Sequence, residues 1–175
     1  MLAITTSFLV HTNSAGQLAG AWGEEFTREE LGKAKRRGLI WGWVDSIERN
    51  GADVDHLVAM SSGSVVAIDS KWRRDTKDEV RLQSDADAAK RSARRAAAIL
   101  GQLESTKSVK ALVAVWGGAQ ADLHGRKVGG IEFISGRKLR GWLRQHQSAR
   151  CERSTAEALL RELEDYRRSS ARSAN

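Results

Sequence analysis

Residues 51–72, GADVDHLVAMSSGSVVAIDSKW, contain two apolar runs separated by a short polar segment. The first run, residues 54–60, begins acidic and becomes apolar, and the second, residues 65–68, is rich in β-branched side chains, which favour strands. The small residues 61–64 between them, with one glycine, are typical of a tight turn. This pattern predicts a β-hairpin whose second strand ends in Asp69-Ser70-Lys71.

The length of the turn determines which side chains of the hairpin share a face. Because alternate strand residues point to the same face, Asp69 and Lys71 lie together. A symmetric turn over residues 61–64 would pair Asp55 with Ser70 and place the Asp55 side chain on the opposite face. A three-residue turn or a bulge brings Asp55 onto the face of Asp69, and we predict one of these irregularities.

The expected cluster of Asp55, Asp69 and Lys71 indicates a metal site. Two carboxylates at one edge of a sheet, with an ammonium group beside them, provide hard oxygen ligands for a divalent cation. Each residue alone also has an ordinary explanation, because an aspartate at a strand end is often solvated and a lysine on a strand edge opposes aggregation. Their combination across one hairpin is more specific than any one of them.

These residues resemble the core motif of a known nuclease superfamily. The segments DHLV at residues 55–58 and VAIDSK at residues 66–71 are similar to the D…(D/E)-x-K motif of the restriction-endonuclease-like, or PD-(D/E)XK, superfamily. More narrowly, the chain resembles the nuclease-related domain (NERD) family, which has a Gly-x-x-Gly-Glu helix upstream and a Gln-led helix downstream. Residues 20–24, GAWGE, and Gln83 match those positions. The motif acid, usually glutamate in the family, is Asp69 here.

The resemblance covers roughly residues 15–146 and implies both a fold and an activity. The implied fold is α/β with a mixed sheet, an αβββαβ core followed by an extra C-terminal strand and helices. The nuclease-related domain would span residues 14–146, and residues 151–168 would form a C-terminal helix packed on the domain or on a partner. The implied activity is a metal-dependent deoxyribonuclease that uses Mg²⁺ or Mn²⁺.

The resemblance also assigns roles to individual residues. Asp55, Asp69 and the carbonyl group of Ser70 would hold the metal ion, and Lys71 would assist the attacking water. Glu24 would hold a metal-bound water or a second ion, with its neighbour Glu25 as the fallback. The expected active-site residues are therefore Glu24, Asp55, Asp69, Lys71 and Gln83, the last lining the cleft. A purely solvated acidic helix face is the alternative for Glu24.

The segment before the hairpin predicts a helix and the first strand. Asn13 or Ser14 is expected to cap a helix that continues to about Arg37. Residues 39–44 are expected to form the first strand, and Asn50-Gly51 is a turn signal that leads into the hairpin.

The first predicted helix combines aromatic residues with glycines. Trp22, Phe26 and Leu31 are expected to form its buried face. Gly20 and Gly23 are unfavourable inside a helix, by about 1 kcal/mol each relative to alanine. Their presence predicts that the helix passes close to the sheet or to the backbone of a ligand.

Downstream of the hairpin, helical and strand patterns alternate. Residues 83–103 predict a helix, and the near-continuous apolar run at residues 109–116 predicts a central strand. A short strand at residues 130–134 and a helix after Ser135 follow, and residues 154–157, STAE, are a capping box that opens the last helix. The buried stripe of the helix at 83–103 should consist of Ala86, Ala89, Ala93, Ala96 or Ala97, and Leu100.

Basic and aromatic side chains predict a surface for nucleic acid. Trp72, Arg73 and Arg74 directly follow the hairpin and offer stacking and phosphate contacts. The helix at residues 83–103 carries like charges one turn apart, which repel one another unless anions neutralise them. We expect this group to bind the DNA backbone without reading its sequence, and a plain solvated face is the alternative. The group consists of Lys90, Arg91, Arg94 and Arg95.

Composition limits the class of protein. The 175 residues fit one domain, and their net charge of +7 favours a polyanionic partner such as DNA, although a merely basic protein would look the same. The single cysteine, Cys151, excludes an internal disulfide and fits a reducing compartment such as the cytoplasm. Residues 1–10 are apolar but carry no basic n-region and are shorter than the roughly 20 residues that span a membrane, so this sequence shows no membrane-spanning segment.

The function predicted from the sequence is therefore metal-dependent hydrolysis of DNA. A binding module that holds DNA on a nuclease fold without cutting it is the alternative, because the motif glutamate is replaced by Asp69. An adaptor that binds a protein through residues 151–168 is a third hypothesis. A homodimer is compatible with the superfamily, many of whose members dimerise.

Overall fold

The computed structural model describes residues 2–49, 51–103, 105, 107–147 and 151–173, with the backbone alone for residues 2–17 and 19. Two short 3₁₀ helices span Gly118–Gln120 and Gly136–Lys138. The order of elements is α1 (Leu2–Arg36), β1 (Ile40–Arg49), β2 (Ala52–Met60), β3 (Val65–Trp72), α2 (Glu79–Gln102), β4 (Val109–Trp116), β5 (Lys127–Val128), β6 (Ile131–Ser135), α3 (Leu139–Gln145) and α4 (Arg153–Ser173). The predicted αβββαβ order is confirmed.

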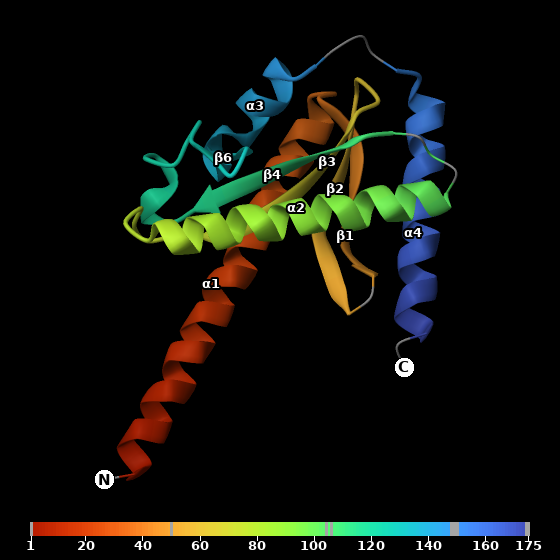
Figure 1. Cartoon of the computed structure of the whole chain (residues 1–175). Helices are drawn as coiled ribbons and strands as arrows, with labels where there is room; N and C mark the ends of the chain where they lie inside the picture. Colours follow the sequence, from red (N-terminus) through yellow and green to blue (C-terminus); the bar gives the residue numbers. More distant parts are fainter. Residues whose placement is uncertain (1, 50, 104, 106, 148–150, 174–175) are drawn as a thin grey trace.

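The described strands form one mixed sheet in the order β1-β2-β3-β4-β6-β5 (Figure 1). The first three strands form an antiparallel meander, as expected. β4 lies parallel to both β3 and β6, while β5 pairs antiparallel with β6. The α/β class and the extra strand and helices after the core are therefore confirmed. The turn predicted at Asn50 lies outside the described residues.

Helices cover both faces of this sheet, and Figure 1 shows α1 and α2 on opposite sides of it. α1 and α3 pack on one face in a buried cluster that includes Leu31 and Val66. α2 and α4 pack on the other face, where a second cluster includes Ala67, Ile99 and Leu163. Val66 and Ala67 are neighbours on β3 yet contact different helical layers, because strand side chains alternate between faces.

The first helix is longer than predicted. It begins at the second residue of the chain, so the cap expected at Asn13 or Ser14 is wrong. Asn and Ser lower helix stability only moderately and do not interrupt a helix that both neighbouring segments continue. The N-terminal part of α1 extends beyond the sheet (Figure 1). In the part of the chain that the structure describes, no helix has the length and hydropathy needed to cross a membrane.

The buried face of α1 differs in part from the expected one. Leu31 is fully buried as predicted, but Trp22 and Phe26 keep 54% and 37% of their surface exposed. The buried positions on this part of the helix include Thr27 and Ala34 instead. The prediction of the buried face of α1 was therefore wrong for Trp22 and Phe26, because the helix turns these two side chains toward the ends of the central strands.

The second helix begins earlier than predicted. The side chain of Asp78 caps it by accepting a 2.8 Å hydrogen bond from the backbone of Arg81, so Gln83 lies in the second turn rather than at the start. Its predicted buried stripe is confirmed, with Ala96 buried and Ala97 exposed. Asp85 is also buried on this face.

The last helix packs on the edge strand β1. Leu159 and Leu163 of α4 are buried in the same cluster as Val44 of β1. A Cβ atom at Gly42 would lie 2.8 Å from a methyl carbon of Leu160, so glycine at this strand position permits the close approach of α4. Of the two locations expected for this helix, the structure places it on the domain.

Candidate active site

The hairpin turn has the odd length that the paired-acid hypothesis requires. The backbone N–H of Met60 donates to the carbonyl oxygen of Ser64 at 2.9 Å, which leaves residues 61–63 as a three-residue turn. Gly63 takes a φ of +83°, a conformation that glycine adopts without strain. The ladder then pairs Ala59 with Val65 and His56 with Ile68. The next residues outward, Asp55 and Asp69, therefore lie opposite each other on one face, as predicted.

The two strands separate where these acids stand. The β2–β3 ladder ends at the pair of His56 and Ile68. Beyond it, the backbone N–H of Ser70 donates to the Asp55 carboxylate at 2.9 Å instead of to a β2 carbonyl. Since the N–H and C=O of one strand residue point to the same neighbouring strand, the Ser70 carbonyl also faces the Asp55 side. The predicted ligands Asp55, Asp69 and Ser70 thus converge on one fork of the sheet.

Asp69 is a buried acid with competing neighbours. Its side chain is only 6% exposed, and the ammonium group of Lys71 binds its carboxylate. Burial raises the pKa of Asp69 to about 7, opposed by the positive charge of Lys71 and increased further by the negative charge of Asp55. The two acids hydrogen-bond to each other, which favours a shared proton. A cation placed between them would relieve this repulsion.

Lys71 is the positive member of this group. Burial lowers the pKa of its ammonium group, but the charge and hydrogen bond of Asp69 outweigh burial and raise that pKa. The charges of Asp55 and Asp85 act in the same direction. Lys71 therefore stays protonated at neutral pH and can donate hydrogen bonds.

Arg73 is bound by Asp85, a residue that was not predicted to belong to the site. Its Nε donates to Oδ2 of Asp85 at 2.8 Å, and a second nitrogen donates to Oδ1. The guanidinium group also donates to the carbonyl oxygen of Trp72 at 2.7 Å. Arg73 thus anchors the chain after β3 to α2, whereas Arg74 is exposed and the Trp72 side chain is half-buried.

Glu24 approaches the acid pair from α1. Burial raises its pKa, and the negative charge of Asp55 raises it further, while Arg28 donates to it at 3.3 Å and lowers it. Gly23 lies against the peptide that joins Lys71 to Trp72, so the helix passes near the sheet there, as predicted. A Cβ atom at Gly23 would make ordinary van der Waals contacts of 3.6–4.0 Å, and one at Gly20 would meet nothing within 4 Å, so this packing does not require glycine at either position.

A second polar network lies on the opposite face of the same strands. The hydroxyl of Ser70 lies 3.2 Å from Nε2 of His56, and Nδ1 of His56 lies 2.6 Å from the Asp45 carboxylate. Thr27 of α1 hydrogen-bonds to the Ser70 hydroxyl at 2.8 Å and accepts from the indole of Trp116 at 2.9 Å. The network joins α1, β1, β2, β3 and β4 behind the acid pair.

This arrangement has the residue types of a Ser-His-Asp triad but not its accessibility. His56 is fully buried and Ser70 is 6% exposed, with Thr27 covering its hydroxyl. A substrate cannot reach the hydroxyl, so the network fixes the strand end rather than supplying a nucleophile. The period-two pattern could have identified it, because His56 and Ser70 are polar residues on the buried face of two apolar strands.

The basic residues of α2 divide between two flanks. Arg95 donates to the carbonyl oxygen of Asp53 at 3.5 Å, so its flank faces β2 and the acid pair. Helical spacing places Arg91 on that same flank, one turn closer to the end of β3. Lys90 and Gln83 lie on the other flank, where both crowd Gly129 of the β5–β6 turn.

Gln83 and Arg94 stand farther from the acid pair than the sequence suggested. Gln83 is exposed and donates to Asp87 at 3.1 Å. Arg94 is exposed, and its spacing places it with Lys90 on the outer side of the helix. The role of Gln83 in the cleft therefore stays a prediction.

The oxygen atoms at the strand fork fit a hard divalent cation in their chemistry. They comprise two carboxylates and one backbone carbonyl, the ligand types that Mg²⁺ and Mn²⁺ prefer. Within the described residues, no group of three or more His, Cys, Asp or Glu side chains is arranged to hold a metal ion. A cation at this fork would therefore take its remaining ligands from water and from the substrate.

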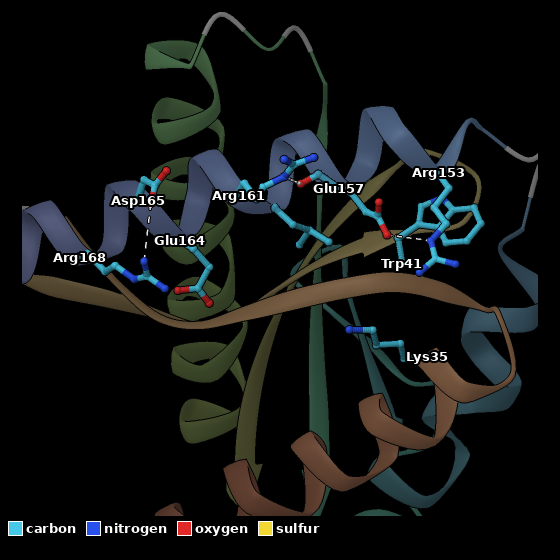
Figure 2. A pocket seen from close by; sticks show the side chains of 9 residues that line it. Lys35, Trp41, Arg153, Glu157, Arg161, Glu164, Asp165 and Arg168 are labelled. Carbon is cyan, nitrogen blue, oxygen red and sulfur yellow. Dashed lines mark hydrogen bonds and ion pairs between the residues drawn. The ribbon is translucent and has the colours of Figure 1, made fainter.

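A separate groove of about 580 Å³ lies between α4, β1 and the end of α1 (Figure 2). Its charged side chains largely neutralise one another, since Arg153 pairs with Glu157 at 2.7 Å and Arg168 with Asp165 at 3.9 Å. The predicted site residues do not appear among the described residues that line it. These are Lys35, Trp41, Arg153, Glu157, Leu160, Arg161, Glu164, Asp165 and Arg168.

The candidate active site is thus an acid pair with a neighbouring lysine, supported from behind by a buried polar network. Three of its members, Asp55, Asp69 and Lys71, stand together as the sequence predicted. Glu24 lies close enough to Asp55 for the charge of Asp55 to raise the pKa of Glu24. Comparisons of the chain with protein-family models, curated proteins and solved structures found no match.

Proposed function

We propose that this protein is a metal-dependent nuclease that hydrolyses the phosphodiester bonds of DNA. The observation that carries the proposal is the juxtaposition of Asp55 and Asp69 at the strand fork, with Lys71 bound to Asp69. The resemblance of these residues to the PD-(D/E)XK motif supports it, and so does the αβββαβ order of the elements.

The chemistry follows from the groups at the fork. Bound Mg²⁺ or Mn²⁺ would polarise the scissile phosphate and lower the pKa of a water molecule. Asp55, Asp69 and the Ser70 carbonyl would hold that cation. Lys71 donates hydrogen bonds to the attacking water or to the phosphate oxygen on which negative charge develops. Glu24, whose pKa is raised, is suited to hold a water molecule or accept a proton.

The positive charge of the protein supports DNA as the substrate. The net charge is +7, and Arg91 and Arg95 lie on the flank of α2 that faces the fork. Contacts of arginine with phosphate give affinity without reading base sequence. The preference for DNA over RNA rests on the family resemblance.

The direct test is a cleavage assay on plasmid DNA and on linear single- and double-stranded DNA, with Mg²⁺, Mn²⁺ or EDTA. We expect metal-dependent cutting that falls by at least about a hundredfold in Asp69→Ala and in Lys71→Ala, the scale of losing one group that acts in the transition state. Ser70→Ala should keep cutting, because its buried hydroxyl only supports the strand. Glu162→Ala, an exposed acid on α4, is the control. Cutting that survives both of the first substitutions would place the chemistry elsewhere.

A DNA-binding module that does not cut is the second candidate. Two observations favour it: Lys71 already neutralises Asp69, and no group of three or more His, Cys, Asp or Glu side chains in the described part of the chain is arranged to hold a metal ion. This alternative predicts DNA binding that weakens as salt rises, without cleavage in any divalent metal.

A further inference from the structure

Four aromatic side chains gather where α1 crosses the ends of β3 and β4. Trp22 meets Trp72 edge to face, with ring centroids 6.1 Å apart. Phe26, one turn further along α1, lies 6.3 Å from Trp72 and 5.4 Å from Trp116. Buried aromatic clusters are common in protein cores, but this one is open to solvent. Trp22 and Phe26 are among the few large apolar side chains of the described chain that stay exposed.

The aromatic cluster borders a hollow of about 400 Å³. Phe26, Trp72 and Trp116 form its apolar wall. Polar groups lie at its rim, where Gln120 offers an amide and Arg137 is an exposed cation without an ion pair among the described residues. A ligand that fits this lining has a flat apolar face and polar edges.

The wall of the hollow is held in place before any ligand binds. The indole of Trp116 donates to Thr27 at 2.9 Å, and its ring lies on Gly136, where a Cβ would come within 2.1 Å of it. A Cβ at Gly117 would lie 2.9 Å from the indole nitrogen of Trp72. Any side chain at these two glycines would displace a wall residue. A rigid aromatic surface binds a flat ligand at low cost in conformational entropy.

The hollow adjoins the candidate active site. Trp72 directly follows Lys71, and the two side chains point to opposite faces of the sheet. The hollow and the acid pair therefore lie at the same end of β3, on opposite faces of the sheet. A strand of nucleic acid that contacts Asp69 and Lys71 and passes around this end of β3 would bring a neighbouring base to Trp72.

The acids that line the hollow are paired with cations. Glu29 and Glu30 both pair with Lys33, at 3.9 Å and 2.7 Å, and Glu30 also pairs with Arg140 at 2.5 Å. A nucleobase, which is uncharged and carries a stacking face, fits this apolar wall. The exposed cations Arg137 and Arg74 can contact the phosphates on either side.

We propose that this hollow binds an unstacked nucleobase, so that the protein engages single-stranded DNA or the frayed end of a duplex. The statement about the base stands on the aromatic wall and on the paired acids of its lining. The statement that the bound strand is the substrate rests on the proposed nuclease function. Stacking on aromatic side chains is tolerant of sequence, because every base has a π face.

The test measures binding in EDTA, so that it does not depend on cleavage. The probes are a dye-labelled oligothymidine, an abasic oligomer of equal length with the same phosphate charge, and a blunt duplex. We expect wild-type protein to bind oligothymidine about tenfold more tightly than the abasic oligomer, the scale of one stacked base. Phe26→Leu, which keeps apolar bulk but removes the ring, should abolish most of this difference. Phe26→Tyr should preserve it.

Two controls separate a local effect from unfolding or another use of the surface. Val80→Ala removes an apolar side chain that is 82% exposed at the start of α2, and it should leave all three affinities unchanged. Thermal unfolding of each variant checks the fold.

Equal affinity for oligothymidine and abasic DNA would overturn the proposal, as would equal weakening of both by Phe26→Leu. Self-association that Phe26→Leu abolishes would overturn it as well, because the surface would then join two copies of the chain. Base-dependent binding without cutting would leave this inference standing and refute the nuclease.

Discussion

At the scale of single residues, Asp69 determines how the candidate site responds to pH. Burial and the charge of Asp55 raise its pKa to about 7, although Lys71 lowers it. In the unfolded chain the same carboxyl group has a pKa near its ordinary value of 3.8. Between these two values the folded state binds more protons than the unfolded state, so stability falls as pH rises through this window.

The pH dependence of metal binding tests this account of Asp69. A divalent cation needs the ionised carboxylate, so Mn²⁺ should raise the unfolding temperature more at about pH 8 than at about pH 5.5. Glu24, whose pKa is also raised, adds to the trend in the same direction. Asp69→Asn should remove most of the metal-dependent shift at both pH values, whereas Glu162→Gln on α4 should keep it. Differential scanning fluorimetry provides the measurement, and equal shifts at both pH values in wild type would contradict it.

At the scale of elements, α2 serves both the core and the proposed DNA surface. Its apolar stripe packs on the sheet, and its basic side chains point to two flanks. The flank with Arg91 and Arg95 faces β2 and the strand fork, while Lys90 lies on the other flank against Gly129 and Arg94 is exposed. The helix therefore separates residues that the sequence alone placed in one basic face.

Paired substitutions on α2 distinguish its two flanks. Arg91→Ala with Arg95→Ala should weaken binding of duplex DNA and lower the slope of log K against log salt by about 2, since each phosphate contact contributes roughly 0.9. Lys90→Ala with Arg94→Ala removes the same charge and is the matched control, for which we expect a smaller change. Fluorescence anisotropy over a range of salt gives both numbers. Equal losses from the two pairs would mean that the helix acts only through its total charge.

At the scale of the whole molecule, α4 completes the hydrophobic core rather than standing apart from it. Leu159 and Leu163 lie in one buried cluster with residues of β1, β2, β3 and α2. This packing changes the test of the adaptor hypothesis. Removing residues 151–175 would expose the core cluster, so loss of function after truncation would not by itself indicate a protein partner.

A single substitution in α4 measures its contribution to the domain. Leu163 is 1% exposed, and Leu163→Ala should reduce the free energy of unfolding by about 2–5 kcal/mol through lost burial and a new cavity. The exposed neighbour substitution Glu162→Ala should change it by less than about 0.5 kcal/mol. Urea denaturation followed by circular dichroism compares the two. Similar small effects from both would show that α4 contributes little to the stability of the domain in solution.

The local features of this protein follow from its sequence. Period-two alternation identified the hairpin and placed Asp69 with Lys71, and the requirement that Asp55 share their face predicted the odd turn that the structure contains. Helical spacing predicted the buried alanines of α2. These features depend on residues close together in the chain, whose relative positions are set by the geometry of one strand, one turn or one helix.

The surroundings of the site were decided by the tertiary structure. The bond between Trp116 and Thr27 joins residues 89 positions apart, and the pair of Arg73 and Asp85 depends on how α2 crosses the sheet. The raised pKa of Asp69 arises from burial that no local pattern reports. Helical spacing placed Trp22 and Phe26 in the core, but Trp22 stays exposed beside Trp72 and Phe26 lines an open hollow, because of the angle at which α1 passes the strand ends. Sequence determines which side chains share a face, whereas burial, charge neighbours and cavities depend on which faces meet.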